Sequence, residues 1–310
     1  MDPRARKQLI SPALLLILLP PLFWAGNFIT GRAVHSIVPP MTLSLWRWVI
    51  ALVCVLPFAW KPMCRDYRLY LTHKWLIVRL SLSGVVAFNS LVYVGLHQTS
   101  ASNALLLNSF IPVLIALFGA AFFKEKLRGV QTFGLVLSFV GVLIIVAHGD
   151  WRMLIAFSFS RGDIIVFMAM VAFAFYTLWL RSVPQNMDRV GLMGAQIATA
   201  FIFLIPLWFA EQSTGQFAQW TPISVMALAY LGVFPSVLAY LMYNLGVAKF
   251  GAARAGLCIH LIPVFGVVLA VIFLNESLHA YHAAGLIAIL IGIRLAMKNR
   301  VIPATSQQQE

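Results

Sequence analysis

The chain has 310 residues, of which 61% are hydrophobic and 10% are charged, and its formal net charge is +13. A water-soluble domain of this length has too little interior for so much apolar surface, so the composition excludes an ordinary soluble protein. The three cysteines, Cys54, Cys64 and Cys258, are scattered and match no disulfide or metal-binding pattern.

The N-terminal segment resembles a secretory signal, because Arg4, Arg6 and Lys7 precede an apolar run that begins at Leu9. No small-x-small cleavage site follows Leu22, and further apolar runs come after it. We therefore expect this segment to remain as an uncleaved first membrane helix.

A helix that crosses about 30 Å of hydrocarbon needs roughly 20 mostly apolar residues. Runs of this kind follow one another with short connections and predict an all-α integral membrane protein with ten transmembrane helices. The predicted spans are Leu9–Thr30, Met41–Trp60, Arg79–Leu96, Ala101–Phe123, Val130–His148, Asp163–Leu180, Leu192–Ala210, Ile223–Leu245, Ala255–Leu274 and Ala280–Met297.

The distribution of Lys and Arg predicts the orientation of these spans. With a cytoplasmic N-terminus, the outer segments hold only Arg32, Arg152 and Arg161, while Arg47 and Arg294 lie inside spans and the other basic residues are cytoplasmic. We therefore predict a multi-pass protein of the cell's inner or plasma membrane with both termini in the cytoplasm. Because topology explains the basic excess, the lipid bilayer is the expected partner and nucleic acid is not.

One phrase occurs twice in the chain, as FFKEKLRGVQTFGLVLSFVG from Phe122 and as FLNESLHAYHAAGLIAILIG from Phe273. Each copy joins the last two spans of a five-span half, and an odd number of crossings inverts the second half relative to the first. Inversion explains why the lysines of the first copy are absent from the second. The predicted organisation is a repeat at 1–150, an inverted repeat at 151–300 and a cytoplasmic tail at 301–310.

Several residues of the repeat have predicted structural roles. Pro112 and Pro263 should kink the fourth and ninth spans at equivalent depths. Small residues seven positions apart, Gly134/Gly141 and Gly285/Gly292, should allow close helix packing. Glu125 and Glu276 precede the fifth and tenth spans, where a carboxylate complements a helix N-terminus.

The duplicated ten-span layout resembles the drug/metabolite transporter superfamily, in particular its EamA-type members. The likeness rests on LFWAGNF at Leu22–Phe28, LWRW at Leu45–Trp48 and the Pro…Glu-x-Leu…Gly…Gly phrase of both halves, and it extends from Leu14 to Met297. The resemblance implies a helical carrier of small organic solutes, often an exporter of amino acids or other metabolites. Inverted halves themselves suit alternating access around a site near the membrane midplane.

Ionisable groups inside the predicted spans are few. None of the nine Asp and Glu residues falls in the middle of a span, which disfavours a proton-coupled pump for hydrophobic cations. Arg47 lies inside the second span, between Trp46 and Trp48. Two interpretations stay open: its guanidinium binds a substrate carboxylate, or it bonds helix-end carbonyls near the outer surface. Its repeat partner is Gln196.

Polar and aromatic side chains from both halves are the candidate lining of a solute pathway. Asn27 and Tyr176 are repeat counterparts, and His260 is a histidine near a span centre that could carry a proton. Each of these residues could instead bond a neighbouring helix or pack in the core. Together with Arg47, the candidate substrate-binding residues are Trp24, Asn27, Asn89, Tyr93, Asn108, Tyr176, Tyr240 and His260.

The function predicted from these observations is a secondary transporter that exports a small organic metabolite, with amino acids among the candidates. The alternatives are an integral membrane enzyme and a passive channel. An enzyme should show a nucleophile, a metal cluster or paired carboxylates at membrane depth, and the sequence offers none of these. We accordingly predict no catalytic residue, no metal site and no cofactor; the oligomeric state is left open, and a monomer is compatible with the layout.

Overall fold

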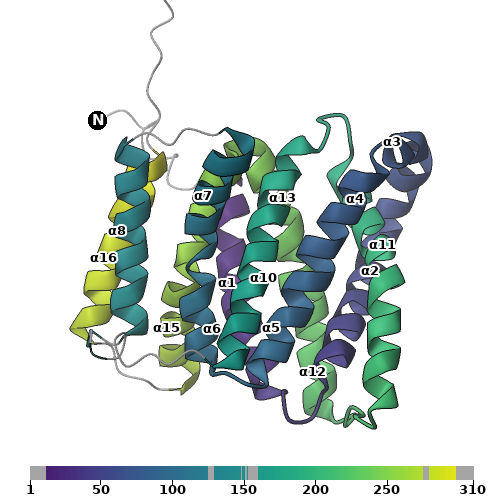
Figure 1. Cartoon of the computed structure of the whole chain (residues 1–310), viewed down its shortest axis with the longest axis horizontal. Helices are drawn as coiled ribbons and strands as arrows, with labels where there is room; N and C mark the ends of the chain where they lie inside the picture. Colours follow the sequence, from purple (N-terminus) through teal and green to yellow (C-terminus); the bar gives the residue numbers. More distant parts are fainter. Residues whose placement is uncertain are drawn as a thin grey trace, which may run out of the picture.

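The computed structural model describes residues 12–124, 129–147, 149–150, 152, 160–274 and 279–297. Throughout these ranges the regular elements are helices, and nine of them are long and apolar enough to cross a membrane, with Ala280–Ala296 as a shorter apolar tenth. The prediction of an all-α protein with ten membrane helices is confirmed. Figure 1 shows the helices standing side by side in one bundle.

The first half contributes five crossings, of which the third and fourth are built from several helical segments. Its elements are α1 (Pro12–Ala33), α2 (Pro40–Arg65), α3 (Tyr67–Thr72), α4 (Lys74–Leu80), the π-helix η2 (Ser81–Ala87), α5 (Phe88–Leu96), α6 (Ala101–Asn108), α7 (Ile111–Phe123) and α8 (Gly129–Val146).

The second half has the same plan. Its elements are α10 (Arg161–Trp179), the 3-10 turn η3 (Leu180–Ser182), α11 (Arg189–Ser213), α12 (Pro222–Leu231), the π-helix η4 (Gly232–Leu238), α13 (Ala239–Phe250), α14 (Ala252–Leu257), the 3-10 turn η5 (Cys258–His260), α15 (Leu261–Leu274) and α16 (Ala280–Met297).

Helix contacts follow a pseudo-twofold relation between the halves. Three contacts join a crossing to its own counterpart: α2 with α11, α7 with α14, and α8 with α16. Two further contacts, α5 with α10 and α1 with α13, are exchanged with each other by the same relation. A twofold relation between two halves of five crossings produces this pattern.

The contact between α2 and α11 shows the antiparallel direction of such a pair. At one end of the bundle, the Thr42 backbone donates to Glu211, and towards the other end a Cβ on Gly194 would touch Ala59. We call the end that carries α3, at the top in Figure 1, the α3 end. The loops at the other end are joined where Gln219 N donates to Ile37 O at 2.8 Å.

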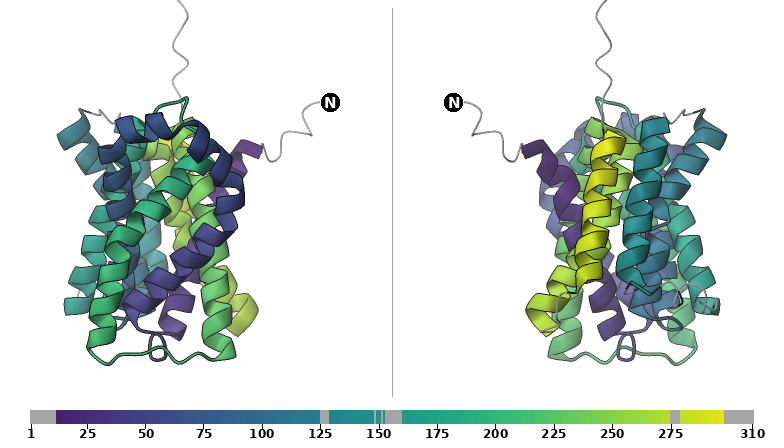
Figure 2. Two further views of the ribbon diagram at one scale, coloured as in Figure 1. Left: turned by 90° about the vertical axis from the view of Figure 1, so that its right-hand side faces the viewer. Right: turned by 90° about the vertical axis from the view of Figure 1, so that its left-hand side faces the viewer.

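The helices α8 and α16 pack against each other at the side of the bundle (Figures 1 and 2). A Cβ on Gly134 would lie 2.5 Å from the Gly292 carbonyl oxygen, and one on Gly141 would lie 2.7 Å from the Gly285 oxygen. The prediction that these glycines permit close helix packing is confirmed. The paired Glu125 and Glu276 lie outside the described residues.

The fourth and ninth crossings break just before their prolines, as predicted. In the first half α6 ends at Asn108 and α7 begins at Ile111, which places Pro112 in the first turn. In the second half η5 precedes α15, in which Pro263 is the third residue. Proline in a first turn costs no helical hydrogen bond, so a helix can begin there. The two prolines therefore mark equivalent helix starts in the two halves.

Several boundaries differ from those predicted by apolarity alone, and two of them lie at the α3 end. The second crossing runs from Pro40 to Arg65, beyond the predicted end at Trp60, and helix continues before Arg79 through α4. Both extensions contain basic residues at the α3 end, where side chains can reach water while the backbone stays helical. Large apolar side chains such as Phe58, Phe209 and Ile287 are exposed on the outside of the bundle, as lipid contact requires.

Candidate functional site

A buried arginine lies between the two halves. Arg47 is on α2, about two turns from its first residue, and its side chain is 0% exposed. Its Nε donates to Ser236 Oγ at 2.8 Å and its Nη1 donates to Asn27 Oδ1 at 2.8 Å and to the Tyr93 hydroxyl. The Tyr93 hydroxyl in turn donates to Asn27 Oδ1 at 2.9 Å. Arg47 therefore connects three crossings from both halves.

No carboxylate neutralises this guanidinium in the part of the chain that the structure describes, where the recorded ion pair is the exposed Arg65–Asp66 contact. The Arg47 Nη2 is buried without a hydrogen-bond partner. The rings of Trp48 and Tyr93 lie 5.4 and 5.6 Å from the guanidinium carbon and stabilise the cation in part. A buried cation with neutral partners and a free donor is electrostatically suited to an anionic group.

The two π-helices lie in equivalent crossings and expose equivalent carbonyls. Gly84 O of η2 accepts from Tyr240 Oη at 2.5 Å and from Asn89 Nδ2 at 3.0 Å. Pro235 O of η4, which is 151 positions later, accepts from Trp24 Nε1 at 3.2 Å. A π-helical turn interrupts the usual bonding of the backbone, which frees these carbonyls for side chains of the other half.

An aromatic cluster surrounds the hydrogen bonds to these two carbonyls. The Trp24 ring packs edge-on against Phe173, Tyr240 and Tyr243, with centroids 5.4, 5.8 and 5.1 Å away. Trp24 is thus held by ring contacts and by its hydrogen bond to Pro235 O. Edge-on packing of this kind rigidifies the centre of the bundle.

A small cavity adjoins the cluster at the seam between the halves. Its walls come from α1, α5, α6, α7, α10, η5 and α15, and its free space is about that of one water molecule. Asn108 Nδ2 is buried there without a partner. The lining residues are Trp24, Asn27, Phe28, Phe88, Asn108, Ile111, Phe173, Ile259 and Ile262.

The second half contains a polar contact equivalent to that of Asn27 and Tyr93, but with the tyrosine on its first crossing and the asparagine on its third. Tyr176 Oη donates to Asn244 Oδ1 at 2.7 Å, and in the next position Thr177 Oγ1 lies 3.0 Å from Tyr243 Oη. Asn27 and Thr177 are each 66 residues from their partners, and Tyr176 is 68 from its partner. Each half therefore contributes one buried Asn–Tyr pair between its first and third crossings.

His260 stands apart from the arginine, next to α8. Its Nε2 lies 3.0 Å from Ser109 O, so this nitrogen donates, and its Nδ1 lies 2.7 Å from Ser138 Oγ. Ser109 and His260 are 151 residues apart and so are repeat counterparts in contact. Histidine here joins the broken fourth and ninth crossings to the fifth.

All nine predicted site residues are buried, and ring contacts of Tyr240 with Trp24 and Tyr176 connect most of them. Arg47, Asn27 and Tyr93 form one group, while Asn89 and Tyr240 meet across the pseudo-twofold axis. Trp24 and Asn108 line the cavity together with Asn27, Tyr176 belongs to the second half's pair, and His260 is separate. Sequence reasoning missed Ser236 and Asn244, although the repeat offset, applied to Tyr93, points to the neighbourhood of Asn244.

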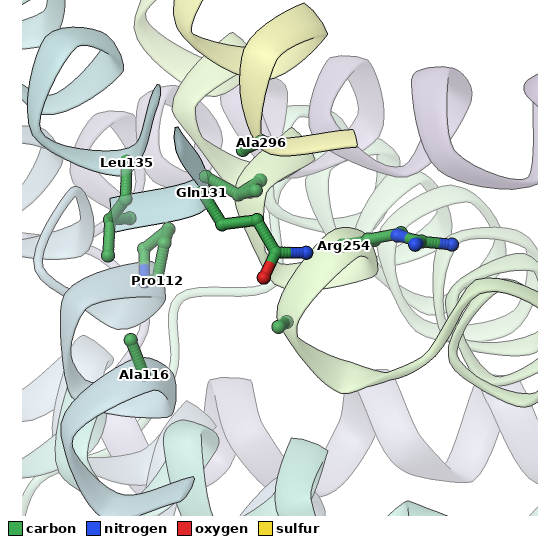
Figure 3. A pocket seen from close by; sticks show the side chains of 8 residues that line it. Pro112, Ala116, Gln131, Leu135, Arg254 and Ala296 are labelled. Carbon is green, nitrogen blue, oxygen red and sulfur yellow. The ribbon is translucent and has the colours of Figure 1, made fainter. Parts of the chain in front are cut away.

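A second pocket lies near the α3 end between α7, α8, α14 and α16 (Figure 3). Pro112, Leu135 and Ala296 line its walls, and Gln131 reaches between the helices. Arg254 extends away from Pro112 and Leu135 in Figure 3. This pocket uses none of the predicted site residues.

The α3 end also carries two titratable contacts outside the membrane spans. The hydrogen bond from Arg65 holds the pKa of the Asp66 carboxyl below its usual value. Burial raises the pKa of Tyr70 to about 12, and its hydroxyl has no hydrogen-bond partner.

The family of the chain follows from its sequence. The model of the EamA-like transporter family matches residues 11–147 and again residues 160–298. The chain belongs to the EamA-like transporter family. Two matches in one chain coincide with the two sets of five crossings in the structure.

Curated relatives of this EamA-like transporter span nearly the same length. It is 29% identical over 289 residues to an uncharacterized transporter of Archaeoglobus fulgidus, covering 91% of this chain and 96% of the relative. It is 24% identical over 291 residues to the uncharacterized transporter YyaM of Bacillus subtilis, covering 93% and 94%. A probable amino-acid metabolite efflux pump of Salmonella typhimurium is 22% identical over 291 residues, covering 90% and 92%.

The fold also has a relative among solved structures. One crystal structure matches with a TM-score of 0.70 at 19% identity, covering 92% of this chain and 96% of that one. The match extends over both halves and bears on the fold alone.

Proposed function

We propose that this EamA-like transporter exports a small metabolite that carries a carboxylate, with amino acids as the first candidates, by alternating access. The observation that carries the proposal is Arg47, a fully buried guanidinium with a free Nη2 and neutral hydrogen-bond partners from both halves. A carboxylate would supply the missing negative charge and accept the free donor. The similarity to a probable amino-acid metabolite efflux pump supports the choice of amino acids as first probes.

Two inverted five-crossing units, at 1–150 and 151–300, are proposed to exchange conformations around Arg47 and its hydrogen-bond partners. The bundle is proposed to lie in the inner or plasma membrane of the cell. In the proposed orientation the α3 end faces the cytoplasm. Arg65, Arg68, Lys74 and Arg189 at or near that end support it, since basic residues accumulate on the cytoplasmic side.

The test is counterflow into proteoliposomes. Vesicles preloaded with unlabelled L-phenylalanine, L-leucine or L-glutamate receive a trace of the same labelled amino acid outside, and a carrier accumulates the label transiently. A passive channel only equilibrates it, and a membrane enzyme changes its chemical form. Counterflow of none of these amino acids, or chemical conversion of one, would overturn the proposal.

Variants at position 47 connect the activity to the site. Arg47→Ala should reduce counterflow at least tenfold, and Arg47→Lys should retain part of it, because lysine keeps the charge but loses the fork of donors. Arg68→Ala, which removes an exposed charge from α3, is the matched control and should transport like the wild type. Full activity of Arg47→Ala would remove Arg47 from the site.

A further inference from the structure

The helix α11 carries a second basic and polar face that no predicted site residue uses. Arg189 begins α11, and Gln196 follows two turns later on the same face. Gln196 is 1% exposed, and its Nε2 has no hydrogen-bond partner. Arg189 is only partly buried, but its Nη1 is shielded from solvent and equally without a partner.

The pseudo-twofold relation places this face next to the second half's Asn–Tyr pair. Gln196 is the repeat partner of Arg47, and Arg47 binds Asn27 and Tyr93 in the first half. The corresponding pair in the second half is Tyr176 with Asn244. The helix α11, which carries Arg189 and Gln196, contacts α13, which carries Asn244.

Free donors gather on this side of the core as well. Asn244 is 1% exposed, and its Nδ2 has no partner because its Oδ1 takes the Tyr176 hydroxyl. The neighbouring carboxylate, Asp188, is engaged in capping α11, where its Oδ1 accepts from Val190 N and Gly191 N at 2.9 and 2.8 Å. Three nitrogens from α11 and α13 therefore lack an acceptor.

We propose that Arg189, Gln196 and Asn244 form a second carboxylate subsite, nearer the α3 end, which receives the transported solute after or before the Arg47 subsite. The inference rests on the proposed function. The two subsites are related by the inversion of the halves, with the cation moved from position 196 to position 189. The solute class that satisfies both is a small molecule with a carboxylate and an apolar body, since the Phe173 ring contacts both Trp24 and Tyr176.

The test measures the KM of L-phenylalanine separately from each face, in proteoliposomes sorted by orientation. Arg189→Gln should raise the KM from the α3 face at least tenfold and leave the KM from the opposite face within about twofold. Gln196→Met, which keeps the length of the side chain but removes its amide, should act in the same direction. Arg68→Gln, an exposed charge at the same end, should change neither value.

Inhibition by L-phenylalaninamide separates recognition from packing. The amide lacks the carboxylate, so its inhibition constant from the α3 face should be the same in Arg189→Gln and wild type. An unchanged KM from the α3 face in both Arg189→Gln and Gln196→Met would overturn the subsite. An equal rise from both faces, or an equal loss of amide inhibition, would overturn it too, because that is the result of damaged packing. Absence of counterflow with any amino acid in the wild type would overturn the proposed function, and the subsite with it.

Discussion

Asn89 and Tyr240 are repeat counterparts 151 residues apart, and Asn89 Nδ2 donates to Tyr240 Oη at 3.1 Å. A contact between counterparts lies on the pseudo-twofold axis, so this bond marks the place where the two halves meet. Both side chains also bond Gly84 O, which the π-helix η2 makes available. The two halves are thus hydrogen-bonded to each other at the centre of their contact.

Tyr240→Phe should lower the free energy of unfolding by about 1 kcal/mol, because Asn89 loses one partner but keeps two backbone acceptors. Thermal unfolding in detergent measures the effect. Tyr67→Phe, which removes an exposed hydroxyl on α3, is the control and should leave the melting temperature unchanged. Equal melting temperatures for Tyr240→Phe and wild type would mean that the seam does not depend on this bond.

The pairing of α8 with α16 makes a second prediction. Gly141→Ala should destabilise the protein by about 1–3 kcal/mol, because the new methyl group would meet the backbone oxygen of Gly285 at 2.7 Å and neither backbone can yield alone.

Gly266→Ala in α15 is the matched control for that substitution. A Cβ there meets nothing within 4 Å, so the change should be neutral or stabilising by up to about 1 kcal/mol. Both variants are compared by thermal unfolding. Similar behaviour of the two would show that close approach of α8 and α16 is not what Gly141 provides.

Sequence reasoning reached the architecture because repetition and charge are properties of the chain order itself. The five-crossing halves, the inversion and the burial of Arg47 need no knowledge of tertiary contacts. The partner of Arg47 in the other half could not be predicted from the sequence, because Ser236 is 189 positions away and belongs to no recognisable motif.

The proposed second subsite could not be predicted from the repeat, because the second half has a glutamine where the first half has Arg47. A search for a repeated arginine finds Gln196, whereas the charge is at Arg189, which looks like an ordinary basic residue at a helix end. The π-helices were equally hidden, since their extra residue is stabilised by contacts such as Trp24 with Pro235 and not by local propensity.

Tyr70 predicts a pH dependence at the α3 end. Burial raises its pKa from 10.0 to about 12, so the folded state keeps the proton where the unfolded state has lost it. The stability that Tyr70 contributes is therefore complete below about pH 10 and is lost progressively as the pH rises towards 12. Melting temperatures at about pH 9 and about pH 11 should fall further apart in wild type than in Tyr70→Phe. An identical pH effect in both proteins would contradict the assignment.

Glu211 at the end of α11 caps the helix α2 from the other half. Its carboxylate accepts from Met41 N at 2.6 Å and from Thr42 N at 2.7 Å, where the N-cap residue Pro39 offers no side-chain acceptor. Glu211→Ala should lower the free energy of unfolding by about 1–3 kcal/mol, since two backbone donors lose their partner at a helix N-terminus. Thermal unfolding checks this, with the exposed Asp150→Ala as the control for loss of one negative charge.

Glu211→Gln separates the hydrogen bonds from the charge in that cap. The amide keeps an acceptor oxygen but no net charge, so its melting temperature should lie between those of wild type and Glu211→Ala. Because Glu211 ties the end of α11 to the start of α2, the same variants should loosen the contact between the two halves farthest from α3. Faster hydrogen exchange of the Met41 and Thr42 amides in Glu211→Ala is the local signature, and unchanged exchange there would show that the two amides find other acceptors.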